Sequence, residues 1–358
     1  MASNYHKLGE YIELVAKTNE KLEYGLNDII GVTIEKTIIP TIANLKETEL
    51  SKFSIVEPKN FVYNPRTHGK KIGLGYNNTK NTYIATWNNN TFKIKDSKKG
   101  ELDPDYLYMF FCRDIWDKEA CFNSWGSSTV VFNWDSFCSI KINVPTLEEQ
   151  KKLVEEYQTI VDRIDVLKRL NNKLETLLDL IYFKYINNAN DIKVLDKIAK
   201  ISAGGDNPVD TVQQPTKECN IPVYSNGNTN DGLFGYTSKA KITTPSITVS
   251  ARGNIGYTVL HLEPYTPIVR LISISPFDKK DLYWLYFVLK TLHYHDNGTS
   301  QQQATIPAFS PLEIKVLDDT NLNVFNETVE PLFIAINQYK IELTKLNKIK
   351  QLLISKII

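Results

Sequence analysis

The residues best suited to chemistry in this sequence are basic, amide and aromatic side chains between residues 59 and 99. Nine lysines and arginines fall in this segment against one aspartate, a local net charge of +8, whereas the whole 358-residue chain carries +1. Cationic side chains bind phosphates, amides read base edges, and aromatic rings pack on bases and sugars. The segment is therefore typical of a nucleic-acid-binding surface.

We expect DNA contacts from ten members of this segment and from the loop that follows Gly126. They are Asn64, Arg66, His68, Lys70, Lys71, Asn77, Lys80, Trp87, Lys93 and Lys95, together with Ser127 and Ser128. A single lysine-rich run is also the usual composition of a solvated face. The run alone leaves both interpretations open.

The second half of the chain carries a weaker version of the same composition. Between Gly232 and Leu262 it has three basic residues and no acidic ones. The expected contacts in this half are Asn226, Asn228, Lys239, Lys241, Arg252 and Asn254, with Gln301, Gln302 and Gln303 after Gly298. Glutamine pairs bidentately with adenine, although such a run is also ordinary loop sequence. Two such segments at corresponding places favour DNA binding.

Catalytic motifs are incomplete. An adenine methyltransferase needs an Asp/Asn-Pro-Pro-aromatic loop, but here Asn64-Pro65 is followed by Arg66 and Thr67. The Gly73-Leu74-Gly75 pair lacks the strand-turn-helix setting of a nucleotide loop. The four cysteines form no close pairs of the kind that bind zinc. We therefore expect no catalytic residue, no metal site and no cofactor bound by this chain.

Length and composition favour two globular domains, and an N-terminus without a cationic segment that leads into a long apolar run favours a cytoplasmic location. Hydrophobic residues make up 42% of the chain, more than one small core requires. No stretch approaches the ~18 apolar residues of a membrane-spanning helix. We expect no membrane association.

The same series of features occurs twice along the chain, which indicates an internal repeat. A short amphipathic segment, an aromatic helix start, a glycine loop and a strand follow one another in each half. The matching pairs are 7–12 with 194–199, 105–111 with 281–287, 126–128 with 298–300, and 140–142 with 314–316. Each half then ends in a long helix.

Apolar residues spaced alternately by four and three predict that these two helices form an antiparallel coiled coil. Thr146 and Glu149 give the first helix a capping box, and no Gly or Pro follows before Asn187. The expected interface is Ile160, Ile164, Leu167, Asn171, Leu174, Leu178 and Ile181 with Ile336, Tyr339, Leu343, Leu346, Asn347, Leu353 and Ile357. Asn171 and Asn347 could face each other and select the register, although a solvent-facing position for Asn347 is equally open. The simpler alternative is that each helix only closes its own domain.

The chain resembles the specificity subunits of type I restriction-modification systems over essentially its whole length. The matching residues are 59–66, with Asn64-Pro65-Arg66, 145–150, with the Pro-x-x-Glu-Glu-Gln pattern, 221–224, 249–256 and 351–356. This resemblance implies a mixed α/β (α+β) fold, with two target-recognition globules in a pseudo-two-fold repeat separated by the two helices. The segments are 1–146, 147–187, 188–323 and 324–358. The second helix lacks the Pro-x-x-Glu-Glu-Gln start, so we expect it to begin near Asn323 to Asn326.

The resemblance also implies a non-catalytic reader of double-stranded DNA, each domain recognising one half of a split target. Its implied partners are two modification methyltransferase subunits and, with them, restriction translocase or endonuclease subunits. S-adenosylmethionine is then expected on the methyltransferase. Two alternatives stay open: a methyltransferase or nuclease with a fused reader, and a helical scaffold that binds something other than DNA.

Overall fold

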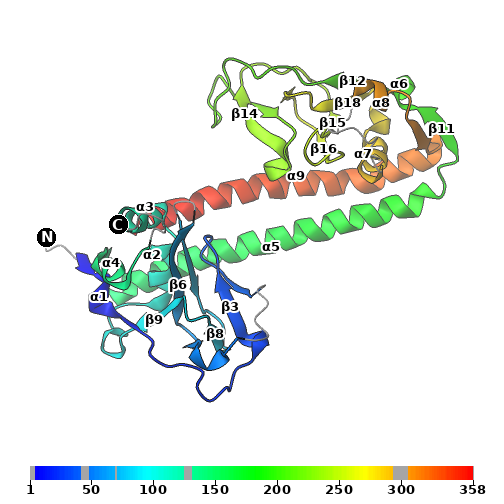
Figure 1. The fold of residues 1–358 in the computed structure, drawn as a ribbon. Coiled ribbons are helices and arrows are strands. Elements are labelled where there is room, and N and C mark those ends of the chain that lie inside the picture. The colour runs from blue at the N-terminus through cyan, green and yellow to red at the C-terminus, as the bar shows by residue number, and fades with distance from the viewer. Residues whose placement is uncertain (1–4, 42–47, 69–70, 125–130, 293–304, 358) are drawn as a thin grey trace. The chain divides into compact units, whose positions relative to one another are not determined.

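The chain forms two compact units in the computed structural model, which describes residues 5–41, 48–68, 71–124, 131–292 and 305–357. Unit 1 comprises Met1–Leu167 and Glu342–Ile358, and unit 2 comprises Lys168–Ile341. Each unit contains part of both long helices, α5 (Leu147–Ile186) and α9 (Asp319–Ser355), which are labelled in Figure 1. The units therefore do not coincide with the four expected segments.

Unit 1 is a mixed α/β fold. Its sheets have the strand orders β2-β9-β6-β7, β4-β3-β8-β5 and β1-β10, and the β3–β8 pair is parallel. Its strands are β1 Tyr5–Lys7, β2 Ile12–Leu14, β3 Ile29–Val32, β4 Ile38–Pro40, β5 Ser54–Val56, β6 Phe61–His68, β7 Lys71–Tyr76, β8 Tyr83–Ala85, β9 Asn90–Ile94 and β10 Lys141–Asn143. Its short helices are α1 Leu8–Tyr11, α2 Pro104–Phe111, α3 Asp114–Phe122 and α4 Trp134–Ser139.

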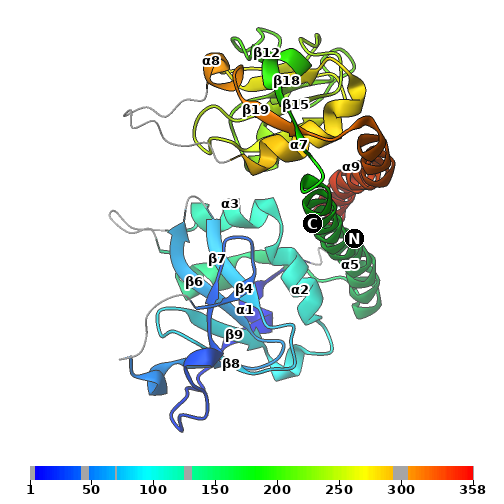
Figure 2. The same cartoon turned by 90° about the vertical axis from the view of Figure 1, so that its right-hand side faces the viewer.

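Among the described residues, unit 2 repeats this topology without a counterpart of β5, with the strand orders β12-β18-β15-β16, β14-β13-β17 and β11-β19. Its strands are β11 Asp191–Val194, β12 Ala199–Ala203, β13 Ile221–Tyr224, β14 Leu233–Thr237, β15 Ser246–Val249, β16 Thr258–His261, β17 Thr266–Pro267, β18 Ile272–Pro276 and β19 Glu313–Val316. Its short helices are α6 Leu195–Ile198, α7 Leu282–Thr291 and α8 Ile306–Phe309. Helix α7 packs on the four-stranded sheet (Figure 2).

The repeat expected from the sequence is confirmed by strand pairing. In each unit the first strand pairs antiparallel with the strand that precedes the long helix, β1 with β10 and β11 with β19. A parallel pair follows in each, β3 with β8 and β13 with β17. The hairpins β6–β7 and β15–β16 therefore occupy equivalent places in the two units.

Both long helices contribute to the core of each unit. In unit 1, Tyr157 of α5 and Ile354 of α9 are buried with the aromatic side chains of α2 and β6, and Ile357 joins them just beyond α9. In unit 2, Leu178 and Tyr182 of α5 are buried with Phe325 and Phe333 of α9. Burying a large apolar side chain contributes roughly 1.5–3 kcal/mol, so neither core is complete without both helices.

Within unit 1 the two helix segments run antiparallel, as predicted. Arg163 Nε lies 2.8 Å from Glu342 Oε1, and the Lys350 ammonium, further along α9, lies over the ring of Tyr157, further back along α5. In unit 2, the rings of Tyr185 and Phe325 are in edge contact where α5 ends and α9 begins. The segments of α5 and α9 in unit 2 therefore also run antiparallel.

The predicted helix-pair residues fall into three groups by burial. Ile164, Leu167, Asn171, Leu178, Ile336, Leu353 and Ile357 are buried, whereas Ile160, Leu174, Ile181, Tyr339, Leu343 and Leu346 are half-buried. Asn347 is exposed, and its side-chain amide donates to the Leu343 carbonyl oxygen of its own helix. The structure thus gives the solvent-facing alternative for Asn347. The neighbouring residues of α9 contact Arg163 and Tyr157 of α5, so Asn347 does not face Asn171.

The start of α5 follows the predicted capping box. Thr146 N–H donates to Glu149 Oε2 at 3.0 Å, and Glu149 N–H donates to Thr146 Oγ1 at 3.3 Å. The expected start of the second helix near Asn323 is wrong. Helix α9 begins at Asp319, because Asp318 supplies a cap by accepting a hydrogen bond from Asn321 N–H at 2.9 Å.

Gln150 ties α5 to the globular part of unit 1. This side chain is fully buried; its oxygen accepts from Asp103 N–H, and its amide donates to the carbonyl oxygens of Glu101 and Pro145, each at 2.8 Å. The final residue of the Pro-x-x-Glu-Glu-Gln motif thus holds together the loop before α2 and the start of the helix. Asn326 of α9 similarly donates to the Lys280 carbonyl oxygen before α7.

We predict that Gln150→Ala lowers the free energy of unfolding by about 2–4 kcal/mol, because it leaves buried backbone groups without partners. Denaturant unfolding of the full chain measures this. Gln158→Ala, on the exposed face of the same helix, is the matched control and should change stability by no more than about 0.5 kcal/mol. Equal effects of the two substitutions would contradict this role of Gln150.

Candidate nucleic-acid interface

The β6–β7 hairpin presents two exposed cations of unit 1. Strand β6 has a register irregularity between Tyr63 and Thr67, and the Asn64 side chain accepts from Arg66 N–H at 2.9 Å within it. Irregularities of this kind redirect side chains out of a sheet. Arg66 and Lys71 are both exposed. The Asn64-Pro65-Arg66 motif therefore shapes a strand so that it offers an arginine to solvent.

The equivalent β15–β16 hairpin of unit 2 also presents an arginine and an asparagine. Its loop, residues 250–257, is closed by hydrogen bonds from Ser250 N–H to the Tyr257 carbonyl and from Gly256 N–H to the Ser250 carbonyl. Arg252 is half-buried, and Asn254 is exposed. The Nε of Arg252 is buried and has no hydrogen-bond partner among the described residues.

A hollow in unit 1 has two of the predicted residues, Asn64 and Trp87, in its lining. It has a volume of about 390 Å³, and Asn64, Trp87, Asn88 and Asn89 contribute to its lining. Trp87 is 72% exposed, which leaves its ring free to stack on a base or sugar. The predicted residue Lys80 is exposed as well.

Most lysines of the 59–99 segment are engaged inside the unit. Lys59 pairs with Asp105, Lys93 with Glu13 and Asp96, Lys98 with Glu101, and Lys99 with Asp96. Three of these carboxylates lie outside the segment. The three outside carboxylates lower the local charge from +8 to +5, and Lys93 carries less free charge than the sequence suggested.

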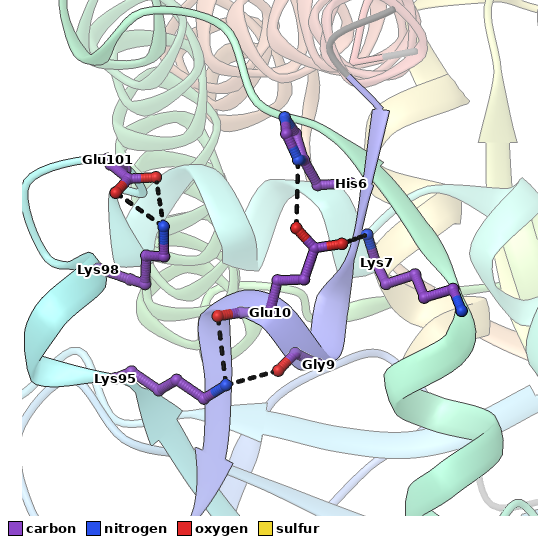
Figure 3. A network of polar contacts seen from close by, with 7 residues as sticks. All are labelled: His6, Lys7, Gly9, Glu10, Lys95, Lys98 and Glu101. Carbon is purple, nitrogen blue, oxygen red and sulfur yellow. Dashed lines mark hydrogen bonds and ion pairs between the residues drawn. The ribbon is translucent and has the colours of Figure 1, made fainter.

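Lys95 has a structural place rather than the predicted free one. Its ammonium donates to the carbonyl oxygens of Gly9 and Glu10 at 2.7 and 3.2 Å, at the end of α1 (Figure 3). Glu10 in turn caps α1 by accepting from Lys7 N–H, which with the nearby His6 lowers the pKa of its carboxyl. Cations are favourable near a helix C-terminus, where carbonyl groups lack partners. The prediction of a DNA contact from Lys95 is corrected accordingly.

Asn77 and Asn226 also have their hydrogen-bonding groups occupied. Asn77 is fully buried; it donates to the carbonyl oxygens of Val56 and Asn81 and accepts from Thr79. Asn226 donates to one loop and accepts from another. Asn77 is therefore closed to DNA, and its predicted contact is wrong. Asn226 is only half-buried, so its predicted contact stays a prediction.

The remaining predicted residues are exposed, or their side chains are not described. Asn228, Lys239 and Lys241 are exposed in unit 2. His68 lies in β6 opposite Lys71, without a described side chain. Lys70, Ser127, Ser128, Gln301, Gln302 and Gln303 lie outside the described residues. Their predicted contacts stay predictions.

Arg270 is an exposed cation that the sequence prediction missed. It follows β17 and has φ +59°, next to Val269 at φ +52°. Left-handed backbone is rare for residues other than glycine, and rarest for β-branched ones. No glycine or charge run marks this position, so only the folded backbone reveals it.

Asp231, in the loop between β13 and β14, is already engaged by an ammonium and a hydroxyl group. Burial alone raises the pKa of its carboxyl, but the Lys340 ammonium at 2.8 Å and the Tyr257 hydroxyl at 2.9 Å bring the pKa below its ordinary value. The side chain therefore stays ionised and anchors the β13–β14 loop to α9 within unit 2.

Within the described ranges, no group of three or more His, Cys, Asp or Glu side chains is arranged to hold a metal ion. Over the same residues, no helix is both long and apolar enough to cross a membrane.

Family comparison divides the chain in the same way as its repeat. Residues 5–176 and 190–351 each match the family described as type I restriction modification DNA specificity domain. The chain belongs to this family. Each matched range covers one specificity domain, from its first paired strand into the long helix that follows it.

Two Mycoplasma pneumoniae proteins named as type I specificity subunits are related in sequence. One is 27% identical over 202 residues, covering 54% of this chain and 55% of the relative. The other is 27% identical over 155 residues, covering 43% and 46%. The chain thus matches about half the length of these relatives.

A solved structure shows the same fold as these paired specificity domains. The crystal structure of the type I restriction-modification system S subunit from M. genitalium aligns with a TM-score of 0.66 and 16% identity, covering 99% of this chain and 95% of that one. At this identity the likeness establishes the fold. It confirms the mixed α/β architecture with two specificity domains.

We predict that Arg66→Ala and Lys71→Ala, on the first specificity domain's hairpin, each weaken DNA binding several-fold. Removing one phosphate-binding cation should flatten the slope of log affinity against log salt concentration by about 0.9. Titration of duplex DNA at several salt concentrations measures both effects. Lys98→Ala and Lys99→Ala, which remove ion-paired lysines, are the controls and should leave the slope unchanged. The opposite pattern would place the interface elsewhere.

Proposed function

We propose that this chain is the sequence-specific DNA-recognition subunit of a type I restriction-modification complex. Each specificity domain contacts one half of a bipartite, asymmetric target. The observation that carries this proposal is the duplicated topology, with cationic side chains on the equivalent hairpins β6–β7 and β15–β16. The two hairpins differ in sequence, so the two half-sites need not be alike.

The long helices set the distance between the half-sites in this proposal. Helix α5 has 40 residues, which corresponds to about 60 Å at 1.5 Å per residue. One turn of B-DNA is about 34 Å, so a helix of this length is long enough to span half-sites one turn apart. Both cores incorporate residues of both helices, which supports the helical spacer of this proposal.

The partners in this proposal are two modification methyltransferase subunits, and with them restriction translocase or endonuclease subunits. Exposed apolar side chains on the unit 2 part of α5 are the observation that supports docking of a partner protein. Leu170, Leu177, Leu180 and Phe183 are 38–62% exposed, and Leu177 and Leu180 contribute to the lining of a shallow hollow. Exposed apolar groups that gather on one element are typical of protein interfaces.

The chain itself performs no methyl transfer in this proposal. S-adenosylmethionine and the chemistry on the adenine belong to the methyltransferase subunit, which also takes the base out of the duplex. The chain's own residues hold the DNA in register.

Mapping methylated adenines in DNA exposed to the chain and its methyltransferase partner tests this function. We expect one split motif with a constant gap, and no methylation by the chain alone. Methyl transfer by the purified chain would favour an enzyme with a fused reader. A complex with methyltransferase that leaves no footprint on DNA would favour a scaffold.

A further inference from the structure

The side-chain amide of Asn226 joins three loops of unit 2 that are far apart in the sequence. It lies in the β13–β14 loop, residues 225–232. Its oxygen accepts from Ala251 N–H at 2.7 Å in the β15–β16 loop, and its nitrogen donates to the Val269 carbonyl at 2.6 Å in the β17–β18 loop. One residue therefore fixes the relative positions of all three loops.

These loops hold an unusual concentration of left-handed backbone. Asn230, Asp231, Val269 and Arg270 all have φ between +52° and +59°, and Gly253 has φ +67°. In the β13–β14 loop, a Cβ on Gly232 would lie 2.5 Å from the Ser225 carbonyl oxygen, so only glycine fits there. Strained backbone persists only where surrounding contacts enforce it, and it clusters at functional sites.

Two arginines extend from the backbone that Asn226 holds. Arg252 follows Ala251, and Arg270 follows Val269. Each arginine is thus the next residue after one that the Asn226 amide holds by a hydrogen bond. Neither guanidinium has an ion pair or hydrogen bond with another described residue. Asp231, the carboxylate of these loops, is engaged by Lys340 and Tyr257.

Both arginines start from backbone that the Asn226 amide holds together, and neither has a described counter-ion, so the arrangement is suited to an anion that both can contact. Lys59, Lys98 and Lys99 of the first specificity domain differ, because carboxylates of that domain pair with them. The phosphodiester backbone of DNA is an anion that arginine binds in a bidentate manner.

Unit 1 clamps its equivalent loops in a comparable way. The turn between β3 and β4 carries Lys36, also at positive φ, whose ammonium donates to the Ile72 carbonyl of β7 and pairs with Asp117 at 2.6 Å. In both specificity domains, a side chain from the β3–β4 turn or the equivalent β13–β14 loop therefore binds the backbone of the equivalent hairpin, β6–β7 or β15–β16.

We propose that Asn226 is a positioning residue for DNA recognition, and that Arg252 and Arg270, held by it, together contact a DNA phosphate of the second half-site. This inference rests on the proposed function and deepens it. It assigns a DNA contact to Arg270 and changes Asn226 from a base-reading residue to one that acts through its neighbours.

The first test measures binding of the full chain to a duplex with the mapped motif across salt concentrations. Arg270→Gln should weaken binding by about five- to tenfold and flatten the salt slope by about 0.9. Lys279→Gln removes an exposed cation elsewhere in unit 2 and should change neither quantity. An Arg270→Gln chain with wild-type affinity and slope would overturn the inference while leaving the proposed function intact.

The second test places a single uncharged methylphosphonate at each position of the second half-site in turn. At one position the modification should weaken binding of the wild-type chain and have little further effect on Arg252→Gln or Arg270→Gln. Full additivity at every position would show that the arginines do not contact a phosphate there. No binding of any duplex by the wild-type chain would overturn the proposed function and this inference together.

The third test separates positioning from folding. Asn226→Ala should weaken binding to the intact motif about tenfold, but leave binding to a duplex with a scrambled second half-site unchanged. In the Asn226→Ala chain, Arg252→Gln should cost much less than in the wild type, because the arginine is already misplaced. Independent effects of the two substitutions, or equal loss on both duplexes, would contradict the positioning role.

Discussion

The structure depends on burial of both long helices in the cores of both units. Residues near the C-terminus, Ile354 and Ile357, complete the core of unit 1, where the Arg113 guanidinium also donates to the Ile357 carbonyl at 2.8 Å. The end of α5 and the start of α9 complete the core of unit 2. The globular parts cannot keep their packing without these helix segments, so the supports are parts of the recognition folds themselves.

Charge distribution separates cations that hold the fold from cations that are available to a ligand. Lys95 satisfies carbonyl groups at the end of a helix, and Lys36 lies in a buried ion pair. Arg66, Lys71 and Arg270 are exposed on hairpins and loops. A chain with almost no net charge can therefore bind a polyanion locally, because affinity depends on the cations that lack internal partners.

The sequence predicted features that depend on local pattern. The capping box at Thr146, the heptad spacing of α5 and the internal repeat follow from residue types at fixed intervals, and the structure confirms each. It did not predict which polar side chains are occupied. Asn77 and Asn226 carry amide groups of the kind that read bases, but they form hydrogen bonds with segments distant in sequence. Similarly, the acids that compensate Lys59 and Lys93 lie outside the basic run. Arg270 was missed because its left-handed backbone is set by tertiary contacts.

The central claim is that each specificity domain grips its own half-site with equivalent hairpins and their neighbouring loops. Nucleotide-resolution footprinting of the full chain on a duplex with both half-sites tests it most directly. The account predicts that an Arg66→Ala, Lys71→Ala chain loses protection over one half-site, and that an Arg252→Gln, Arg270→Gln chain loses it over the other. Equal loss over both half-sites with either chain, or full protection with both, would contradict it.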